Sequence, residues 1–231
     1  MVTVSRLLGA ISFMKDAKHQ SKRHPRKAAT YHHGDLRRSL VRAALELAAE
    51  GRDWNFSLRE VARRAGVSHN APYGHFAHKR DLLAAAAAAG HELLQSELMA
   101  AIGKVKKPLT SLLRMGAAYI DFGTKNAALY RLMFTAALVG PDWRPEQALA
   151  SGVATRALLE DILGRGARSG VFAPVLNRKS ELQIAALHAW AAVHGLTMLL
   201  LDGLATVENL SSERMAQRVL NTISRGLEAG R

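Results

Sequence analysis

The side chains with the clearest binding chemistry lie between residues 57 and 80. The amide of Asn70 and the hydroxyl of Ser57 can each donate one hydrogen bond and accept another. Residues 15–33 precede them as a basic arm with almost no apolar content, which we expect to be flexible. This chemistry suits binding to a polyanion.

The net charge of +13 is unevenly placed along the chain. Residues 1–80 hold 16 Lys and Arg against 6 Asp and Glu, whereas residues 81–231 hold 16 against 13. A solvated basic surface would spread the charge evenly. We therefore expect a polyanion-binding module joined to a nearly neutral second part.

Most catalytic and metal chemistry is missing from the sequence. The chain has no cysteine, which excludes disulfides, thiolate zinc sites and a cysteine nucleophile. It also lacks a glycine-rich phosphate loop, a Gly-x-Ser-x-Gly elbow and a zinc-protease motif. His69, His75 and His78 raise metal sensing as an alternative, but no clustered acids accompany them. We therefore expect no enzyme activity, no cofactor and no metal.

The elements that must position the binding residues are helices. Apolar residues recur at helical spacing from Leu36 and predict a first helix that stops at Gly51. Ser57 and Glu60 form a capping box that predicts the start of a second helix. Gly66 tolerates a positive φ at the end of that helix.

A third, short helix follows after only two residues. Ser68 is a good N-cap and predicts a helix to about His75, in which Pro72 lies near the first turn. Gly66 makes the turn between the second and third helices, and Val67 can fill the space between them. This pair predicts a helix-turn-helix whose second helix presents its polar N-terminal end outward.

The remainder of the chain predicts longer helices and an all-α fold. A helix begins near Lys79 and ends near Gly103, and further helices are expected over residues 108–125, 127–138, 146–168, 178–203 and 211–228. We expect a basic arm over residues 1–33, a three-helix DNA-binding domain with the helix-turn-helix over 34–80, and a larger helical bundle over 81–231. Residues 184–201 carry no formal charge and just reach membrane-spanning length, but a buried helix is favoured.

Several runs of the sequence resemble the TetR family of transcription regulators. The run Ser57–Ser68 and the run Pro72–Phe76, followed by Lys79 and Leu82, resemble the N-terminal domain of that family. Residues 190–195, Trp-Ala-Ala-Val-His-Gly, resemble a signature in one branch of its C-terminal domain. Four positions depart from the usual family pattern: Ala71-Pro72, Gly74, His78 (where a serine cap is usual) and Arg80.

The resemblance implies a role for each matching position. Tyr73, His75 and Lys79 match residues that grip DNA phosphates. Ser68, His69, Asn70 and Ala71 lie where base edges are met. Asn70 could bridge N6 and N7 of an adenine, or it could only cap its helix. Ser57, besides capping, could donate to a phosphate. Arm residues could follow the adjacent backbone or enter a minor groove, or they could form a tail that only aids solubility: Lys22, Arg23, Arg26 and Lys27.

The resemblance also implies that the second domain binds a small molecule and forms a homodimer. Aromatic residues and methionines crowd one stretch and predict a small apolar or aromatic effector, although such residues are more often ordinary core: Met115, Tyr119, Phe122, Tyr130, Met133, Phe134 and Trp143. The last two helices are expected to pair with their mates through Leu182, Trp190, Leu196, Leu200, Leu210, Val219 and Ile223. His194 is expected to be a buried, hydrogen-bonded histidine.

The sequence is compatible with three functions. The favoured one is a cytoplasmic, ligand-responsive regulator, acting as a repressor, that binds a palindromic DNA operator as a homodimer and not a membrane. An architectural DNA-binding protein without an effector is the alternative within DNA binding. A membrane-anchored helical protein, held by residues 184–201, is the third.

Overall fold

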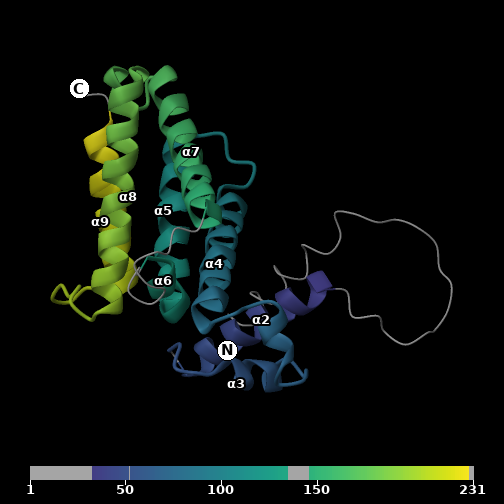
Figure 1. Ribbon diagram of the computed structural model, residues 1–231. Coiled ribbons are helices and arrows are strands. Elements are labelled where there is room, and N and C mark those ends of the chain that lie inside the picture. Colours follow the sequence, from purple (N-terminus) through teal and green to yellow (C-terminus); the bar gives the residue numbers. More distant parts are fainter. Residues whose placement is uncertain (1–32, 52, 135–145, 229–231) are drawn as a thin grey trace. The chain divides into compact units, whose positions relative to one another are not determined.

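Helices form nearly all the regular structure of the computed structural model, which describes residues 33–51, 53–134 and 146–228 (Figure 1). Within these ranges there are eight α-helices and two short 3₁₀ helices, and the only strand-like pairing is an isolated bridge between Phe172 and Glu228. The described residues form two compact units. The N-terminal unit comprises residues 33–93 and 128–134, and the C-terminal unit comprises 94–127 and 146–228. The predicted all-α fold is confirmed.

The N-terminal unit is built from helices that carry small residues where they meet. Its elements are α2 (His33–Gly51), α3 (Leu58–Arg64), the 3₁₀ helix η1 (Ala71–Gly74), the first part of α4 (Lys79–Ile102) and nearly all of α6 (Ala127–Phe134). Small and branched side chains let α2 and α3 approach closely. The core residues with at most 2% exposure include Leu40, Ala44, Val61, Ala62 and Phe76.

An ion-pair network joins α2 to α3 at the surface. The guanidinium of Arg64 donates to both carboxylate oxygens of Glu50, in one case at 2.7 Å, and lies 3.6 Å from Glu46. Arg42 in turn lies 3.8 Å from Glu46. Hydrogen bonding to Arg64 lowers the pKa of the Glu50 carboxyl. The network connects the C-terminal end of α3 to α2, although exposed pairs of this kind add little stability.

Helices α4 and α6 meet at Gly90. A Cβ atom at this position would lie 2.8 Å from Leu129 Cδ1 and 2.8 Å from Met133 Sδ, so only glycine fits without a shift. The next residue, His91, is buried and meets the ring of Phe134 edge to face at 5.4 Å. The described part of α6 therefore packs as part of the N-terminal unit.

The C-terminal unit is a helical bundle around α5 (Pro108–Lys125). Helix α5 contacts α7 (Glu146–Arg168), α8 (Lys179–Leu201) and α9 (Ser212–Leu227), and Figure 1 shows these helices side by side. A Cβ on Gly116 of α5 would lie 2.3 Å from Leu220 of α9, which shows how closely these two helices pack.

The short link between α7 and α8 is fixed in the core. Phe172 is fully buried, and a Cβ on Gly166 of α7 would lie 2.0 Å from its ring. The 3₁₀ helix η3 (Pro174–Asn177) follows directly. The N–H of Ala173 donates to Leu227 O at 2.9 Å, which ties this link to the end of α9.

Two of the predicted helices differ in extent from the described structure. The short helix expected from about Ser68 to His75 is only partly confirmed: the structure has turns at residues 68–70 and the 3₁₀ helix Ala71–Gly74. Pro72 has no N–H to donate and disfavours a helical conformation at Ala71, so a regular α-helix cannot extend through this segment. Helix α6 is described to Phe134, and the rest of the expected span to residue 138 lies outside the described residues.

Candidate nucleic-acid interface

The turn between α3 and η1 depends on Gly66. Its φ of +70° is a left-handed conformation that favours glycine. The N–H of Val67 donates to Ala62 O at 3.0 Å, and the N–H of Gly66 donates to Arg63 O at 3.2 Å. These bonds use the free carbonyls at the end of α3 and turn the chain toward residue 68. The predicted glycine turn is confirmed.

The start of α3 is held by the predicted capping box. The N–H of Glu60 donates to Ser57 Oγ at 3.2 Å, and the N–H of Ser57 donates to Glu60 Oε2 at 2.7 Å. The Ser57 hydroxyl also donates to the same carboxylate at 2.8 Å. These bonds lower the pKa of the Glu60 carboxyl. In this structure the Ser57 hydroxyl is therefore used inside the protein, and a phosphate contact would require it to rotate away from Glu60.

The residues after the turn present polar side chains to solvent. Ser68, His69 and Asn70 are exposed, and Tyr73 is 50% exposed. Asn70 is the N-cap of η1 but makes no side-chain capping hydrogen bond. Its amide therefore stays available for an external partner. His75 is half-buried, whereas Pro72 and Phe76 are buried and anchor the exposed segment to the core.

Lys79 begins α4 beside this segment. Its ammonium lies 5.2 Å from the centroid of the Phe56 ring, within the range of a cation–π contact. Arg37 of α2 lies in a similar way 5.4 Å from the Phe76 ring. The Asp81 carboxylate accepts from the N–H of His78 at 2.8 Å. This is the return bond of a capping box, from the N-cap N–H to the side chain at N3, and it differs from the bond that a serine hydroxyl at position 78 would accept.

The remaining predicted site residues fall into three groups. Met115, Tyr119 and Phe122 are buried on α5 in the C-terminal unit. Tyr130, Met133 and Phe134 lie on α6 in the N-terminal unit. The structure thus divides the predicted effector residues between its two units. Five others lie outside the described residues: Lys22, Arg23, Arg26, Lys27 and Trp143.

A polar network that joins α5 to α8 was missed from the sequence. The phenol oxygen of Tyr119 accepts from Trp190 Nε1 at 3.0 Å and lies 3.3 Å from His194 Nδ1. Tyr119 is buried, Trp190 is 40% exposed and His194 is half-buried. Partial burial lowers the pKa of the His194 imidazole. The prediction that His194 is hydrogen-bonded is confirmed. Its partner Tyr119 lies 75 residues away in the chain, so the helical periodicity of α8 could not predict this pair.

The described residues were also compared with the requirements of metal binding and of a membrane span. Within the described ranges, no group of three or more His, Asp or Glu side chains is placed to hold a metal ion. Among the helices described, α8 alone has the length and hydropathy to span a membrane, with a mean hydropathy of 1.7. Core helices of soluble proteins have the same properties, so this is weak evidence for a membrane segment.

Two helical elements joined by a glycine turn, with exposed polar residues leading into the second, define a helix-turn-helix DNA-binding protein. Residues 40–86 match the family model for bacterial regulatory proteins of the tetR family, and residues 112–223 match the tetracyclin repressor-like C-terminal domain. The chain belongs to the TetR family and is a DNA-binding transcription regulator. Repression, ligand binding and dimer formation are typical of this family, whose members are generally not enzymes.

Solved structures share this architecture over most of the chain. A protein of unknown function from Rhodococcus sp. RHA1 is 28% identical, with a TM-score of 0.71 over 87% of this chain and 99% of its own. A tetR-family regulatory protein from Rhodococcus RHA1 is 21% identical, with a TM-score of 0.62 over 85% and 98%. The ketosteroid regulator KstR2 of Mycobacterium tuberculosis is 17% identical, with a TM-score of 0.57 over 84% and 95%. No curated protein matches the chain significantly.

Proposed function

We propose that the chain is a cytoplasmic repressor that binds a palindromic operator as a homodimer and releases it when a small molecule binds. The observation that carries this proposal is the exposed polar segment after Gly66. Its side chains face solvent, while Pro72 and Phe76 hold its backbone against the core. Such a segment can enter a major groove without rearrangement of the domain that carries it.

The DNA contacts are proposed residue by residue within a DNA-binding domain of residues 34–80. Tyr73, His75 and Lys79 contact phosphates, and Asn70 pairs with an adenine edge through its unused amide. Ser68 and His69 meet neighbouring bases, and Ser57 donates to a phosphate after leaving Glu60. The basic arm adds phosphate or minor-groove contacts through Lys22, Arg23, Arg26 and Lys27. Each phosphate contact releases counterions, so the affinity falls steeply as salt rises.

The proposed homodimer forms through the last two helices, with α8 at its centre. Ile184, Leu187 and Leu199 of α8 are 61%, 54% and 46% exposed, whereas its buried face carries Ala185, Ala189 and Val193. A second copy that covers this apolar face would remove it from water. Leu196 and Ile223 are buried within the chain and contribute to its own core instead. We call residues 68–75 the recognition segment. Twofold symmetry would set its two copies roughly 34–36 Å apart, or one DNA turn.

The proposed effector is a small apolar or aromatic molecule that binds in the C-terminal domain. Met115, Tyr119 and Phe122 supply apolar material on α5, and the network of Tyr119 with Trp190 supplies a polar group in apolar surroundings. Sites for small molecules combine such surfaces with a few polar groups. An effector that prefers a dimer with a different spacing of the recognition segments weakens operator binding by its differential affinity.

Selection of bound sequences from random duplex DNA tests the proposal. Wild type, Tyr73→Ala and the control Arg225→Ala, an exposed residue of α9, are selected in parallel. We expect a palindromic consensus with wild type and with the control, and its loss with Tyr73→Ala. Binding without any consensus, equally strong in all three, would support an architectural protein. Recovery of the chain only with membranes would contradict the cytoplasmic assignment.

A further inference from the structure

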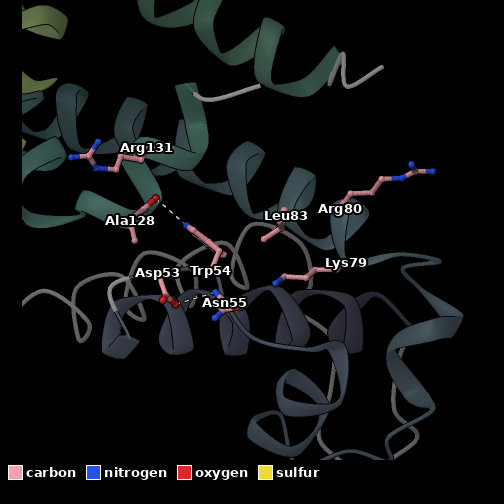
Figure 2. Close-up of a pocket in the computed structure, with 8 residues that line it drawn as sticks. All are labelled: Asp53, Trp54, Asn55, Lys79, Arg80, Leu83, Ala128 and Arg131. Carbon is pink, nitrogen blue, oxygen red and sulfur yellow. Dashed lines mark hydrogen bonds between the residues drawn. The ribbon is translucent and has the colours of Figure 1, made fainter. Parts of the chain in front are cut away.

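A groove of about 550 Å³ lies within the N-terminal unit, on a different part of the chain from the proposed effector site. Its walls come from the loop before α3, the first turns of α4 and the start of α6, as Figure 2 shows. This volume falls within the range of small-molecule sites. Nothing in the proposed DNA contacts explains an open hollow here. The lining residues are Asp53, Trp54, Asn55, Lys79, Arg80, Leu83, Ala128 and Arg131.

The apolar part of the groove is held rigidly. Trp54 is 7% exposed, and its indole Nε1 donates to Ala128 O at 3.0 Å, a bond drawn as a dashed line in Figure 2. The Trp54 ring also packs against Phe56 with centroids 5.8 Å apart. Leu83 is 5% exposed on the adjoining face of α4. These contacts fix the surface in advance, so a ligand would not need to order it.

The polar part of the groove is mostly cationic. Lys79, Arg80 and Arg131 line it, and Asp53 is its single acid. The Asp53 carboxylate already accepts from the N–H of Asn55 at 3.0 Å. In Figure 2 the Lys79 ammonium points toward Asn55, whereas the Arg80 guanidinium points away from the groove. Lys79 is therefore the cation best placed to meet a ligand beside the apolar surface.

We propose that this groove binds a small organic anion whose apolar body lies against Trp54 and Leu83 and whose carboxylate or sulfonate pairs with Lys79. The apolar surface excludes inorganic phosphate as the preferred ligand, because phosphate would leave that surface uncovered. The excess of positive charge disfavours cationic ligands and favours an anion over a neutral ligand of the same shape. A ligand that occupies the groove also holds the Lys79 ammonium that is proposed to contact DNA. It therefore weakens operator binding, a step that rests on the proposed function.

Binding is tested first without DNA, with 2-naphthoate as the probe. The indole N–H resonance of Trp54 is assigned by its loss in Trp54→Phe and then followed by NMR during the titration. We expect a saturable shift of this resonance. Lys79→Met should weaken binding at least about tenfold, because it removes the charged donor that pairs with the carboxylate. Neutral 2-naphthalenemethanol should bind about tenfold more weakly for the same reason.

Two further variants separate this site from other binding. Lys104→Met removes an exposed lysine of the C-terminal unit and should leave the probe affinity unchanged. Ala128→Met places a longer side chain in the groove and should abolish the shift, with circular dichroism as the check on folding. The site is disproved by an unmoved Trp54 resonance, by equal affinity of wild type and Lys79→Met, or by a shift confined to the Trp190 resonance.

The effect on DNA is measured separately, on an operator recovered by selection. Saturating 2-naphthoate should weaken operator binding of wild type at least tenfold and have little effect on Ala128→Met. Unchanged operator affinity at saturating probe would disprove the competition for Lys79. Failure to recover an operator would count against the proposed repressor, and the NMR titration alone would then decide the groove.

Discussion

The two units of the molecule use their polar side chains in opposite ways. In the N-terminal unit Ser68, Asn70 and Tyr73 are exposed on a segment whose apolar residues are buried. In the C-terminal unit the phenol of Tyr119 is buried and shared between Trp190 and His194. The first arrangement leaves hydrogen-bonding groups to a partner, whereas the second satisfies them within the fold. A ligand at the Tyr119 network would therefore have to replace or extend bonds already present.

The largest expected effect concerns the packing of the C-terminal unit. Phe172→Ala removes a fully buried ring that fills the space beside Gly166, and should lower the free energy of unfolding by about 3–5 kcal/mol. Urea denaturation followed by circular dichroism measures the change. Val175→Ala, at a residue 38% exposed, is the control and should change it by less than about 0.5 kcal/mol. Equal stability of the two variants would show that the close approach at Gly166 does not exist.

Tyr119→Phe tests whether the polar network stabilises the second unit. Loss of the hydroxyl leaves Trp190 Nε1 and His194 Nδ1 without this partner, and should cost about 1–3 kcal/mol. The matched change in the first unit, Tyr73→Phe, alters an exposed residue and should leave stability unchanged. Denaturation midpoints of the two variants give the comparison. Equal midpoints would remove the contrast between the units.

Gly66→Ala tests the turn that orients the recognition segment. An alanine at a φ of +70° should cost about 1–2 kcal/mol, because its Cβ is crowded by the backbone in this conformation. Gly74→Ala is the control, since its φ is not positive and a Cβ would meet no atom within 4 Å. The thermal midpoint of Gly66→Ala should fall, and that of the control should not. A fall in both would point to a general intolerance of this segment instead of strain at Gly66.

The serine N-caps of α3 and α9 are expected to contribute unequally to stability, and this difference is smaller than the effects above. Ser57 caps α3 within a reciprocal capping box, whereas Ser211 caps α9 through a single bond of 3.3 Å to the N–H of Arg214. Ser57→Ala should therefore cost about 1 kcal/mol, and Ser211→Ala less. Paired denaturation curves measure the difference. The opposite order would mean that the return bond from Glu60 adds nothing.

The smallest expected effect is a dependence of stability on pH. Burial lowers the pKa of the His91 and His194 imidazoles below the ordinary value of 6.5. As the pH falls through 6.5 the unfolded chain takes up these protons before the folded chain does, so stability is intact above this pH and is lost below it. Denaturation at pH 7.5 and 5.5 should show the loss, and His91→Gln or His194→Gln should each reduce it. A pH dependence that both variants retain in full would assign it to other groups.

The sequence predicted the features that depend on residues close to one another in the chain. The capping box at Ser57 and the turn at Gly66 depend on residues within a few positions, and both are confirmed. Most of the helix bounds are confirmed for the same reason. The predicted third helix had Pro72 near its first turn. Because proline disfavours a helical conformation at the preceding residue, Ala71, the structure has only a 3₁₀ turn there. The Tyr119 network, the contact at Gly90 and the division of the aromatic residues between two units arise from tertiary packing, which no periodicity in the sequence encodes.

The brevity of η1 has a consequence for how such a regulator can change. Ser68, His69 and Asn70 precede the single 3₁₀ turn, expose their side chains and carry no role in the core. Substitutions there should alter stability by no more than about 0.5 kcal/mol. Pro72 and Phe76 meanwhile keep the backbone in place. Because these three positions belong to the proposed DNA contacts, we expect substitutions there to change the DNA preference of the chain while the scaffold is left intact.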